Sequence, residues 1–310
     1  MCASKKDFTN LIQVTTHFSD KKVCREYLSS IRWQGTVNCP FCASERCNLL
    51  KGKNVRYKCY GCRKTFSETK GTIFENSPIS LQKWFVAIWL NTSHKKGISS
   101  IQLSKDIGVT QKTAWFMLQR IRKAMETNNF NKPMVTEVEA DETYIGGKNK
   151  NRHANKKVNN AQGRSTKDKT AVIGLVERNG RVTAKKVSKT DAKTIKKFVN
   201  ANVSKDAVLY TDEYRSYNGL GKEYDLQRVN HGSGLYVIGD AHTNTIEGFW
   251  SLLKRGIIGI YHSVSTKHLD RYIDEFEYRY NTKDLTEASR FENLISLVGG
   301  KRITYKELTS

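Results

Sequence analysis

The sequence has no long hydrophobic run. No stretch of its 310 residues approaches the roughly 18 apolar residues that a membrane-spanning helix needs. The N-terminus, MCASKKDFTN, also has no apolar segment typical of a secretory signal, so we expect a cytoplasmic protein. Acidic residues are scarce as well, with 30 Asp and Glu against 53 Lys and Arg and a formal net charge of +23. Because the basic residues are spread along the chain, the charge favours a polyanionic partner over a membrane-surface helix.

Cysteines are too few and too uneven for a disulfide framework. There are seven, an odd number in a long chain, and four of them form two C-x2-C pairs separated by 16 residues. This spacing is typical of a zinc ribbon that holds one structural zinc ion through four thiolates. The predicted zinc ligands are Cys39, Cys42, Cys59 and Cys62. Cys47 lies between the pairs and could compete as a ligand, whereas Cys2 and Cys24 are expected to be free thiols.

A helix-turn-helix pattern lies between the ribbon and the middle of the chain. Residues 98–125 read as two helices broken at Gly108, with apolar side chains facing inward. Three residues at the exposed start of the second helix, where base edges would be contacted, are Gln111, Lys112 and Thr113. Two helices of an ordinary spacer are the alternative. The aromatic stripe before them, which starts at Trp84, is interpreted as core and not as a base-stacking surface.

The hydrophobic period changes after Pro133. Strands are predicted at 135–144, 171–177, 181–187 and 207–211, with a helix at 191–203, and together they indicate a mixed α/β sheet. A segment of high positive charge, 146–170, separates the first two strands and holds eight Lys or Arg and one Asp. It has no hydrophobic pattern, so we expect a mobile loop. Four lysines in it are predicted to hold DNA phosphates, with a merely solvated loop as the alternative: Lys148, Lys150, Lys156 and Lys157.

Three acidic residues are the candidate catalytic ligands. Asp141 lies late in the first strand, Asp212 ends the fourth, and Glu247 opens a later helix. Carboxylates from two strand ends and one helix can meet at a sheet edge and hold a pair of Mg²⁺ ions for phosphoryl transfer. Lys254 follows Glu247 by seven residues and therefore shares its helical face, where it can reach the DNA backbone.

Neighbouring residues leave alternatives open at these positions. Asn244 and Glu247 have the spacing of a capping box, which would give Glu247 a purely structural role. Glu142 and Glu213 each follow a candidate ligand and should point to the opposite face of a strand, which predicts surface acids. His242 could stand near the metals or bond within its loop. Trp250, which follows Glu247 on the same helix, is interpreted as packing.

These segments together resemble a known family. The cysteine pairs are followed by DETYIGGK from Asp141, TDEYRSY from Thr211, HTNTIEGFWSLLKRGIIGIYH from His242 and KHLDRYIDEFEYRYN from Lys267. In this combination the sequence resembles bacterial insertion-sequence transposases of the DDE class that join a zinc ribbon to an ISXO-type, ribonuclease-H-like core. The resemblance extends from the ribbon to Asn281.

The resemblance implies a fold, an activity and partners. It implies a ribonuclease-H-like mixed sheet and an enzyme that cleaves transposon ends and joins them to target DNA on two Mg²⁺ or Mn²⁺ ions. Its partners would be double-stranded DNA and further copies of the chain, as a homodimer or higher oligomer on DNA. Asp141, Asp212 and Glu247 match the family's three acids, with 34 residues between the last two, and Lys254 matches its downstream basic residue. The third position can be Asn in this subgroup, so Asn244 is a second candidate.

Five regions are predicted from these patterns. They are a helical lead-in (1–36), the zinc ribbon (37–70), a helix-turn-helix region (78–128), a ribonuclease-H-like catalytic domain (133–281) and a C-terminal tail (282–310). A transposase fits this order best. A nuclease or resolvase on the same core is the enzymatic alternative, and a non-catalytic DNA-binding regulator is the other, although a regulator would not need three converging carboxylates.

Overall fold

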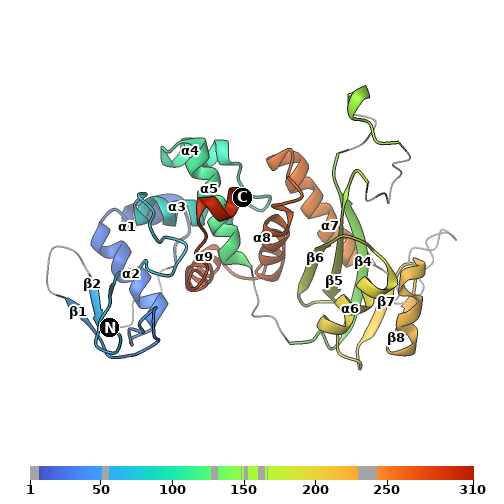
Figure 1. The fold of residues 1–310 in the computed structure, drawn as a ribbon, viewed down its shortest axis with the longest axis horizontal. Helices are drawn as coiled ribbons and strands as arrows, with labels where there is room; N and C mark the ends of the chain where they lie inside the picture. The colour runs from blue at the N-terminus through green and yellow to red at the C-terminus, as the bar shows by residue number, and fades with distance from the viewer. Residues whose placement is uncertain are drawn as a thin grey trace. The chain divides into compact units, whose positions relative to one another are not determined.

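The computed structural model describes most of the chain, as two compact units. It describes residues 7–50, 56–126, 132–147, 149, 153–159, 165, 167–229 and 243–310, with the side chain of Lys156 left out. One unit comprises Met1–Met125 together with Asp284–Ser310, and the other comprises Glu126–Lys283 (Figure 1). Each is described by itself below.

The first unit contains helices and one small sheet. Its elements are α1 (Leu11–His17), α2 (Lys21–Trp33), β1 (Cys47–Leu50), β2 (Arg56–Cys59), β3 (Thr65–Phe66), α3 (Leu81–Ser93), α4 (Ser100–Ile107), α5 (Gln111–Met125), α9 (Glu287–Ser296) and α10 (Tyr305–Thr309). Polar residues at the helix starts explain these boundaries. Asn10, Asp20, Ser80 and Ser99 each accept a hydrogen bond from a backbone N–H in the first turn of the helix that follows.

An aromatic core holds this unit together. The rings of Phe18 and Phe85 lie 4.7 Å apart, and Phe85 and Phe291 lie 6.0 Å apart. Trp84 and Trp89 are both buried, as the interpretation of the aromatic stripe required. Phe291 belongs to α9, so residues 284–310 are part of this unit, whereas the sequence suggested only a tail. The sequence analysis did not predict α9, because the helix is short and its four buried residues give only a weak periodic pattern within a polar sequence.

The two helices of the predicted helix-turn-helix are present. Gly108 ends α4 in the left-handed conformation at φ 60°, where a side chain would be strained. The Thr110 hydroxyl then accepts a hydrogen bond from the backbone N–H of Thr113 at 3.2 Å and begins α5. Ala114, Leu118 and Ile121 are buried. The turn and the inward face of α5 are therefore local consequences of the sequence.

The second unit is a five-stranded mixed sheet covered by helices on both faces (Figure 1). Its elements are β4 (Glu137–Ile145), η2 (Ala154–Lys156), β5 (Thr170–Glu177), β6 (Val182–Val187), α6 (Ala192–Asn202), β7 (Val208–Thr211), η3 (Arg215–Lys222), β8 (Asp225–Arg228), α7 (Asn244–Gly256), η5 (Ile257–Tyr261) and α8 (Leu269–Asn281). The four predicted strands and the helix α6 are confirmed. β8 was missed because its sequence, DLQR, has almost no apolar pattern.

The order of the strands puts β4 and β7, which carry or precede two of the candidate ligands, next to each other. The order is β6-β5-β4-β7-β8, in which β4, β7 and β8 pair in parallel and β5 pairs antiparallel to both neighbours. A central first strand, followed by a two-strand meander on one side and parallel strands on the other, is a ribonuclease-H-like sheet. β4 and β7 are neighbours, and the shorter β7 ends beside the middle of β4, so Asp212 lies next to Asp141.

The two faces of the sheet have separate cores. Val138 and Ala140 of β4 pack with Ile195 and Val199 of α6. Val172 of β5 lies on the other face, in a cluster with residues of α7 and α8. On β4 the face opposite Val138 and Ala140 carries Glu137, Glu139 and Asp141, because strand side chains alternate. This acidic row therefore faces α7.

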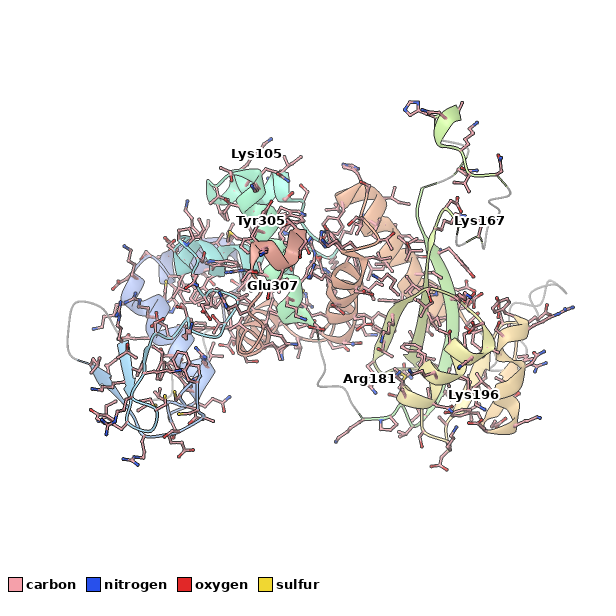
Figure 2. The ribbon with its side chains drawn as sticks, in the orientation of Figure 1. Lys105, Lys167, Arg181, Lys196, Tyr305 and Glu307 are labelled. Carbon is pink, nitrogen blue, oxygen red and sulfur yellow. The ribbon has the colours of Figure 1, made fainter. Side chains whose placement is uncertain are left out.

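Positive charge is present on both units. Lys105 on α4 and Lys196 on α6 are both exposed (Figure 2). Within the described residues, no helix has both the length and the apolar character needed to cross a bilayer.

Candidate functional sites

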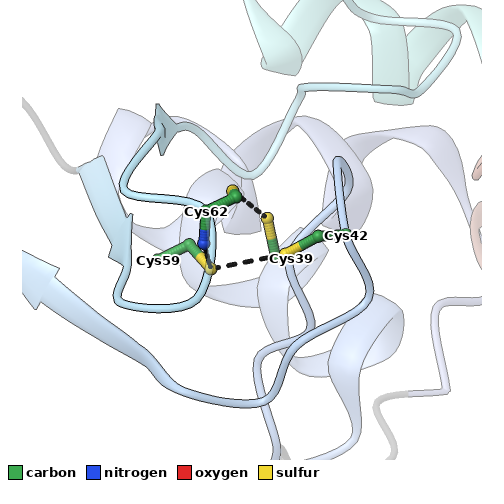
Figure 3. Close-up of side chains that lie close together, drawn as sticks. All are labelled: Cys39, Cys42, Cys59 and Cys62. Carbon is green, nitrogen blue, oxygen red and sulfur yellow. Dashed lines mark hydrogen bonds between the residues drawn. The ribbon is translucent and has the colours of Figure 1, made fainter.

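The four predicted zinc ligands lie together. Figure 3 shows Cys39, Cys42, Cys59 and Cys62 brought to one point by two loops, and their sulfur atoms all lie within 4.8 Å of one another. The Sγ atoms of Cys39 and Cys62 are 3.6 Å apart, as are those of Cys42 and Cys59. A tetrahedral ion with Zn–S bonds of about 2.3 Å separates its sulfurs by about 3.8 Å, so the four thiols fit zinc.

The two loops have the same backbone shape. The N–H of Cys39 donates to the carbonyl of Ser44, and the N–H of Cys59 donates to the carbonyl of Lys64, five residues on in both cases. The residue after each second cysteine is left-handed, Ala43 at φ 57° and Arg63 at φ 61°. This repeated turn is what aims two sulfurs of each pair in one direction.

Backbone N–H groups donate hydrogen bonds to two of the four sulfurs. The N–H of Phe41 donates to Cys39 Sγ and the N–H of Cys62 donates to Cys59 Sγ, both at 3.4 Å. The bond from Cys62, with further donors, lowers the pKa of Cys59 to about 6 and favours its thiolate. Cys47 is outside the group of four, and its thiol donates instead to the carbonyl of Ser44.

A second site lies on the five-stranded sheet of the second unit, where β7 ends beside β4. Thr211 pairs in parallel with Ala140, so the next residues, Asp212 and Asp141, are neighbours. They line a pocket of about 400 Å³ together with Glu247 and Lys254 from α7. The structure therefore brings together all four residues that the sequence proposed for this site. Carboxylates from three elements around one pocket are a donor set suited to Mg²⁺ or Mn²⁺.

The electrostatics of the pocket centre on Asp141. Burial, the largest cause, raises the pKa of Asp141 to about 6, and the nearby carboxylate of Asp212 adds to the rise. The indole N–H of Trp250 donates to Asp141 Oδ2 at 3.0 Å and acts in the opposite direction. A bound cation would offset the repulsion between these carboxylates.

Helix α7 carries the third acid in an unforeseen setting. Its N-cap residue is Thr243, and Asn244 is the first helical residue, so the capping box between Asn244 and Glu247 is wrong. The Thr243 hydroxyl donates instead to Glu247 Oε1 at 3.2 Å. Glu247 lines the pocket, whereas Asn244 is exposed and is not among its described lining residues. The boundary moved by one residue because sequence patterns fix helix ends only to within a few residues.

Glu142 was misjudged from sequence. It does lie on the opposite face of β4 from Asp141, as predicted, but it is buried and not a surface acid. The segment η3 covers it, and the Tyr217 hydroxyl donates to its Oε2 at 3.1 Å. One carboxylate oxygen of Glu142 lies within 4.8 Å of oxygens on both Asp141 and Asp212. Glu213, by contrast, is exposed as expected. Only the covering segment, far along the chain, distinguishes the two.

The remaining site residues fall partly outside the described chain. Gln111 and Lys112 are exposed at the start of α5, and Thr113 is half-buried. Lys112 Nζ lies 4.8 Å from the centre of the Tyr305 ring. In the basic segment Lys157 is exposed, while Lys148, Lys150, the side chain of Lys156 and also His242 lie outside the described residues. Trp250 is buried against the sheet, in agreement with its predicted packing role.

Two family models match the two sites separately. An ISXO2-like transposase domain matches residues 134–281, and a transposase zinc-ribbon domain matches residues 19–65. A ribonuclease-H-like sheet with an acidic edge, joined to a four-cysteine ribbon, defines a zinc-ribbon transposase of the DDE class.

Sequence relatives extend the match over most of the chain. A protein of transposable element ISH50 from Halobacterium salinarum is 30% identical over 87% of this chain and 93% of its own length. The chain therefore belongs to the ISXO2-like transposase family. A transposase-like protein of Haemophilus influenzae is 27% identical over 38% of this chain and 93% of its own.

Solved structures give a weaker likeness. The matches to the pre-cleavage Mos1 transpososome and to the Mos1 strand transfer complex each cover 65% of this chain. They cover 74% and 73%, respectively, of the matched Mos1 chains. The TM-scores are 0.26 and 0.25, and the identities are 14% and 13%. The fold assignment consequently rests on the strand topology and the family match.

Proposed function

We propose that this transposase binds the ends of its insertion sequence, cleaves the DNA strands there and joins them to target DNA. The observation that carries the proposal is the single pocket lined by Asp141, Asp212, Glu247 and Lys254 at the edge of the sheet. A location in the bacterial cytoplasm, where such DNA is found, and assembly as a homodimer or higher oligomer on the DNA are parts of the same proposal.

Each acidic residue has a role in this mechanism. Asp141, Asp212 and Glu247 would hold two Mg²⁺ or Mn²⁺ ions, which when bound activate a water or a strand-end hydroxyl and stabilise the leaving oxygen. By holding the ions, the carboxylates would set where the reacting phosphate lies relative to the attacking oxygen. Because Lys254 is exposed on the same helix face as Glu247, its ammonium would pair with a flanking phosphate and orient the strand.

The other modules would select and hold the DNA. In this proposal Gln111, Lys112 and Thr113 contact base edges at the element's ends, with the zinc ribbon as a further end-recognition module. The lysines of the basic segment would neutralise phosphates. Changing Lys148, Lys150, Lys156 and Lys157 together to Ala should then flatten the dependence of DNA affinity on salt by up to about 4 counterions. An unchanged slope would remove this segment from the DNA-contact surface.

The decisive experiment combines the purified protein, Mg²⁺ and labelled DNA carrying the element's ends. We expect nicking at the ends and joined products, and we expect Asp212→Asn to abolish both while it still binds the ends. Glu213→Gln is the matched control, since it removes the neighbouring but exposed acid. Nicking without joining would indicate a nuclease, and binding without nicking by the wild type would indicate a regulator. Either result would overturn the proposal.

A further inference from the structure

Glu139, the middle carboxylate of the acidic row on β4, accepts hydrogen bonds from α7. Glu139 is completely buried, although it is a charged residue two positions before Asp141. Its Oε2 accepts a hydrogen bond from the backbone N–H of Ile246 at 3.0 Å, and its Oε1 accepts one from the Thr245 hydroxyl at 2.9 Å. Thus a strand residue contacts the first turn of the helix that carries Glu247.

These bonds replace a missing helix cap. An N-cap side chain normally accepts from the second or third N–H of its own helix, but Thr243 makes no such bond in α7. Ile246 is the third helical residue, so Glu139 occupies the place of a cap from a strand more than 100 residues earlier. A negative charge at this end also interacts favourably with the helix dipole. The cap thereby fixes both the distance and the rotation of α7 relative to β4.

A half-buried arginine, Arg178, extends the connection to β7, the strand that precedes Asp212. Arg178 Nε donates to Glu139 Oε1 at 3.0 Å, and its Nη1 donates to Glu137 Oε2 at 3.2 Å. The guanidinium lies 4.1 Å from the centre of the Tyr210 ring, and the Tyr210 hydroxyl donates to Glu137 Oε1 at 3.0 Å. Tyr210 lies on β7, two residues before Asp212. One polar network therefore joins β4, β7 and α7, the three elements that carry the candidate metal ligands.

We propose that Glu139 is a positioning residue that caps α7 from β4 and thereby sets Glu247 at its working distance from Asp141 and Asp212. It does not line the pocket itself. This inference rests on the proposed function, since it assigns Glu139 a role through the three acids of that site. Groups that orient metal ligands from behind typically change metal affinity 10- to 100-fold when altered, which sets the size of the expected effect at about 10-fold.

The test compares Glu139→Gln with Glu277→Gln. Both residues are buried carboxylates in the same unit, and Glu277 also accepts a backbone N–H, that of Ala184, but it joins α8 to β6. Mn²⁺ affinity is measured without DNA by electron paramagnetic resonance, and amide exchange is measured at Ile246 and Glu247. We expect Glu139→Gln to weaken Mn²⁺ binding about 10-fold and to speed exchange at these amides, while Glu277→Gln changes neither by more than about 2-fold.

A second variant keeps the test informative if Glu139→Gln folds poorly. Thr245→Val removes one bond to Glu139 without changing the strand, and it should give a smaller loss in the same direction. Unchanged Mn²⁺ affinity in a folded Glu139→Gln or Thr245→Val, or an equal loss in Glu277→Gln, would overturn the positioning role. These readouts need no cleavage, so a wild type that binds Mn²⁺ but does not cut DNA would contradict the proposed function and not this inference.

Discussion

The four-cysteine site and the carboxylate pocket are built in opposite ways. All four sulfurs come from 24 consecutive residues, 39–62, and two copies of one local turn aim them together. The acids of the pocket come from β4, the end of β7 and α7, which span more than 100 residues. With the proposed metals bound, the first site would need its ion to hold a small structure together, whereas the second would need a large structure to hold its ions.

This difference teaches where each site is vulnerable. If zinc is bound as proposed, removing a ligand from the ribbon should take away the main source of its stability, because so short a segment buries little apolar surface. Substitutions at residues that support α7 should act by shifting this helix relative to the sheet, even where they do not contact an acid of the pocket. The predictions below test that contrast.

The largest effect is expected at the ribbon. Replacing Cys39 and Cys42 by Ser should abolish zinc binding and unfold the ribbon, since structural zinc supplies on the order of 10 kcal/mol to such sites. The second unit, Glu126–Lys283, should keep its own unfolding transition. Zinc content by mass spectrometry and thermal unfolding would measure both. Cys47→Ser is the control, and retention of one zinc per chain by the double variant would show that the ligand set is wrong.

A steric change behind the pocket should act next most strongly. Gly174 lies opposite Asp141 on β5, and a Cβ there would lie 2.5 Å from Cη2 of Trp250. Because the indole is rigid, Gly174→Ala should displace Trp250 and α7, lowering the free energy of unfolding by about 1–3 kcal/mol and slowing end cleavage. Gly219→Ala, with no neighbour within 4 Å of its Cβ, is the matched control. Equal effects from both variants would argue against close packing of α7 at this point.

A pH effect is expected at Asp141 in the metal-free protein. The pKa of Asp141 is raised by folding from 3.8 to about 6, so ionisation of this side chain opposes folding. That opposition is absent well below pH 3.8 and complete above pH 6. Relative to Asp141→Asn, the wild type should therefore lose roughly 2 kcal/mol of stability between pH 4 and pH 7.5. Urea unfolding in EDTA would measure the difference, and Mg²⁺ at pH 7.5 should reverse it. A pH-independent difference would contradict a raised pKa of Asp141.

The smallest effect returns to the ribbon. Arg63 is left-handed at φ 61°, a conformation that disfavours a side chain by roughly 1 kcal/mol. Arg63→Gly should relieve this strain and raise zinc affinity a few-fold, measured by competition with a chelator. Lys64→Gly, one position later, is the control and should give no gain. A loss of affinity in Arg63→Gly would mean that the arginine side chain contributes more than its backbone costs.

Tertiary context limited what could be predicted about individual acids. The sequence EVEAD places Glu137, Glu139 and Asp141 on one face of a strand, and this alternation was the signal that could have identified Glu139. It does not reveal that α7 lies over that face. Likewise nothing near Glu142 in the sequence indicates that η3 would cover it and that Glu213 would remain exposed.

The sequence by itself determined the four clustered cysteines of the ribbon, the α4–α5 turn, four of the five strands of the large sheet and three of the four acids that line the pocket. Each of these depends on neighbours within a few residues or on strong hydrophobic periodicity. The tertiary structure alone decided that α9 joins the first unit, that Thr243 and not Asn244 is the N-cap residue of α7, and that Glu139 accepts hydrogen bonds from the first turn of this helix. Those outcomes depend on contacts between segments far apart in the chain, where packing and burial outweigh the local preference of any one residue.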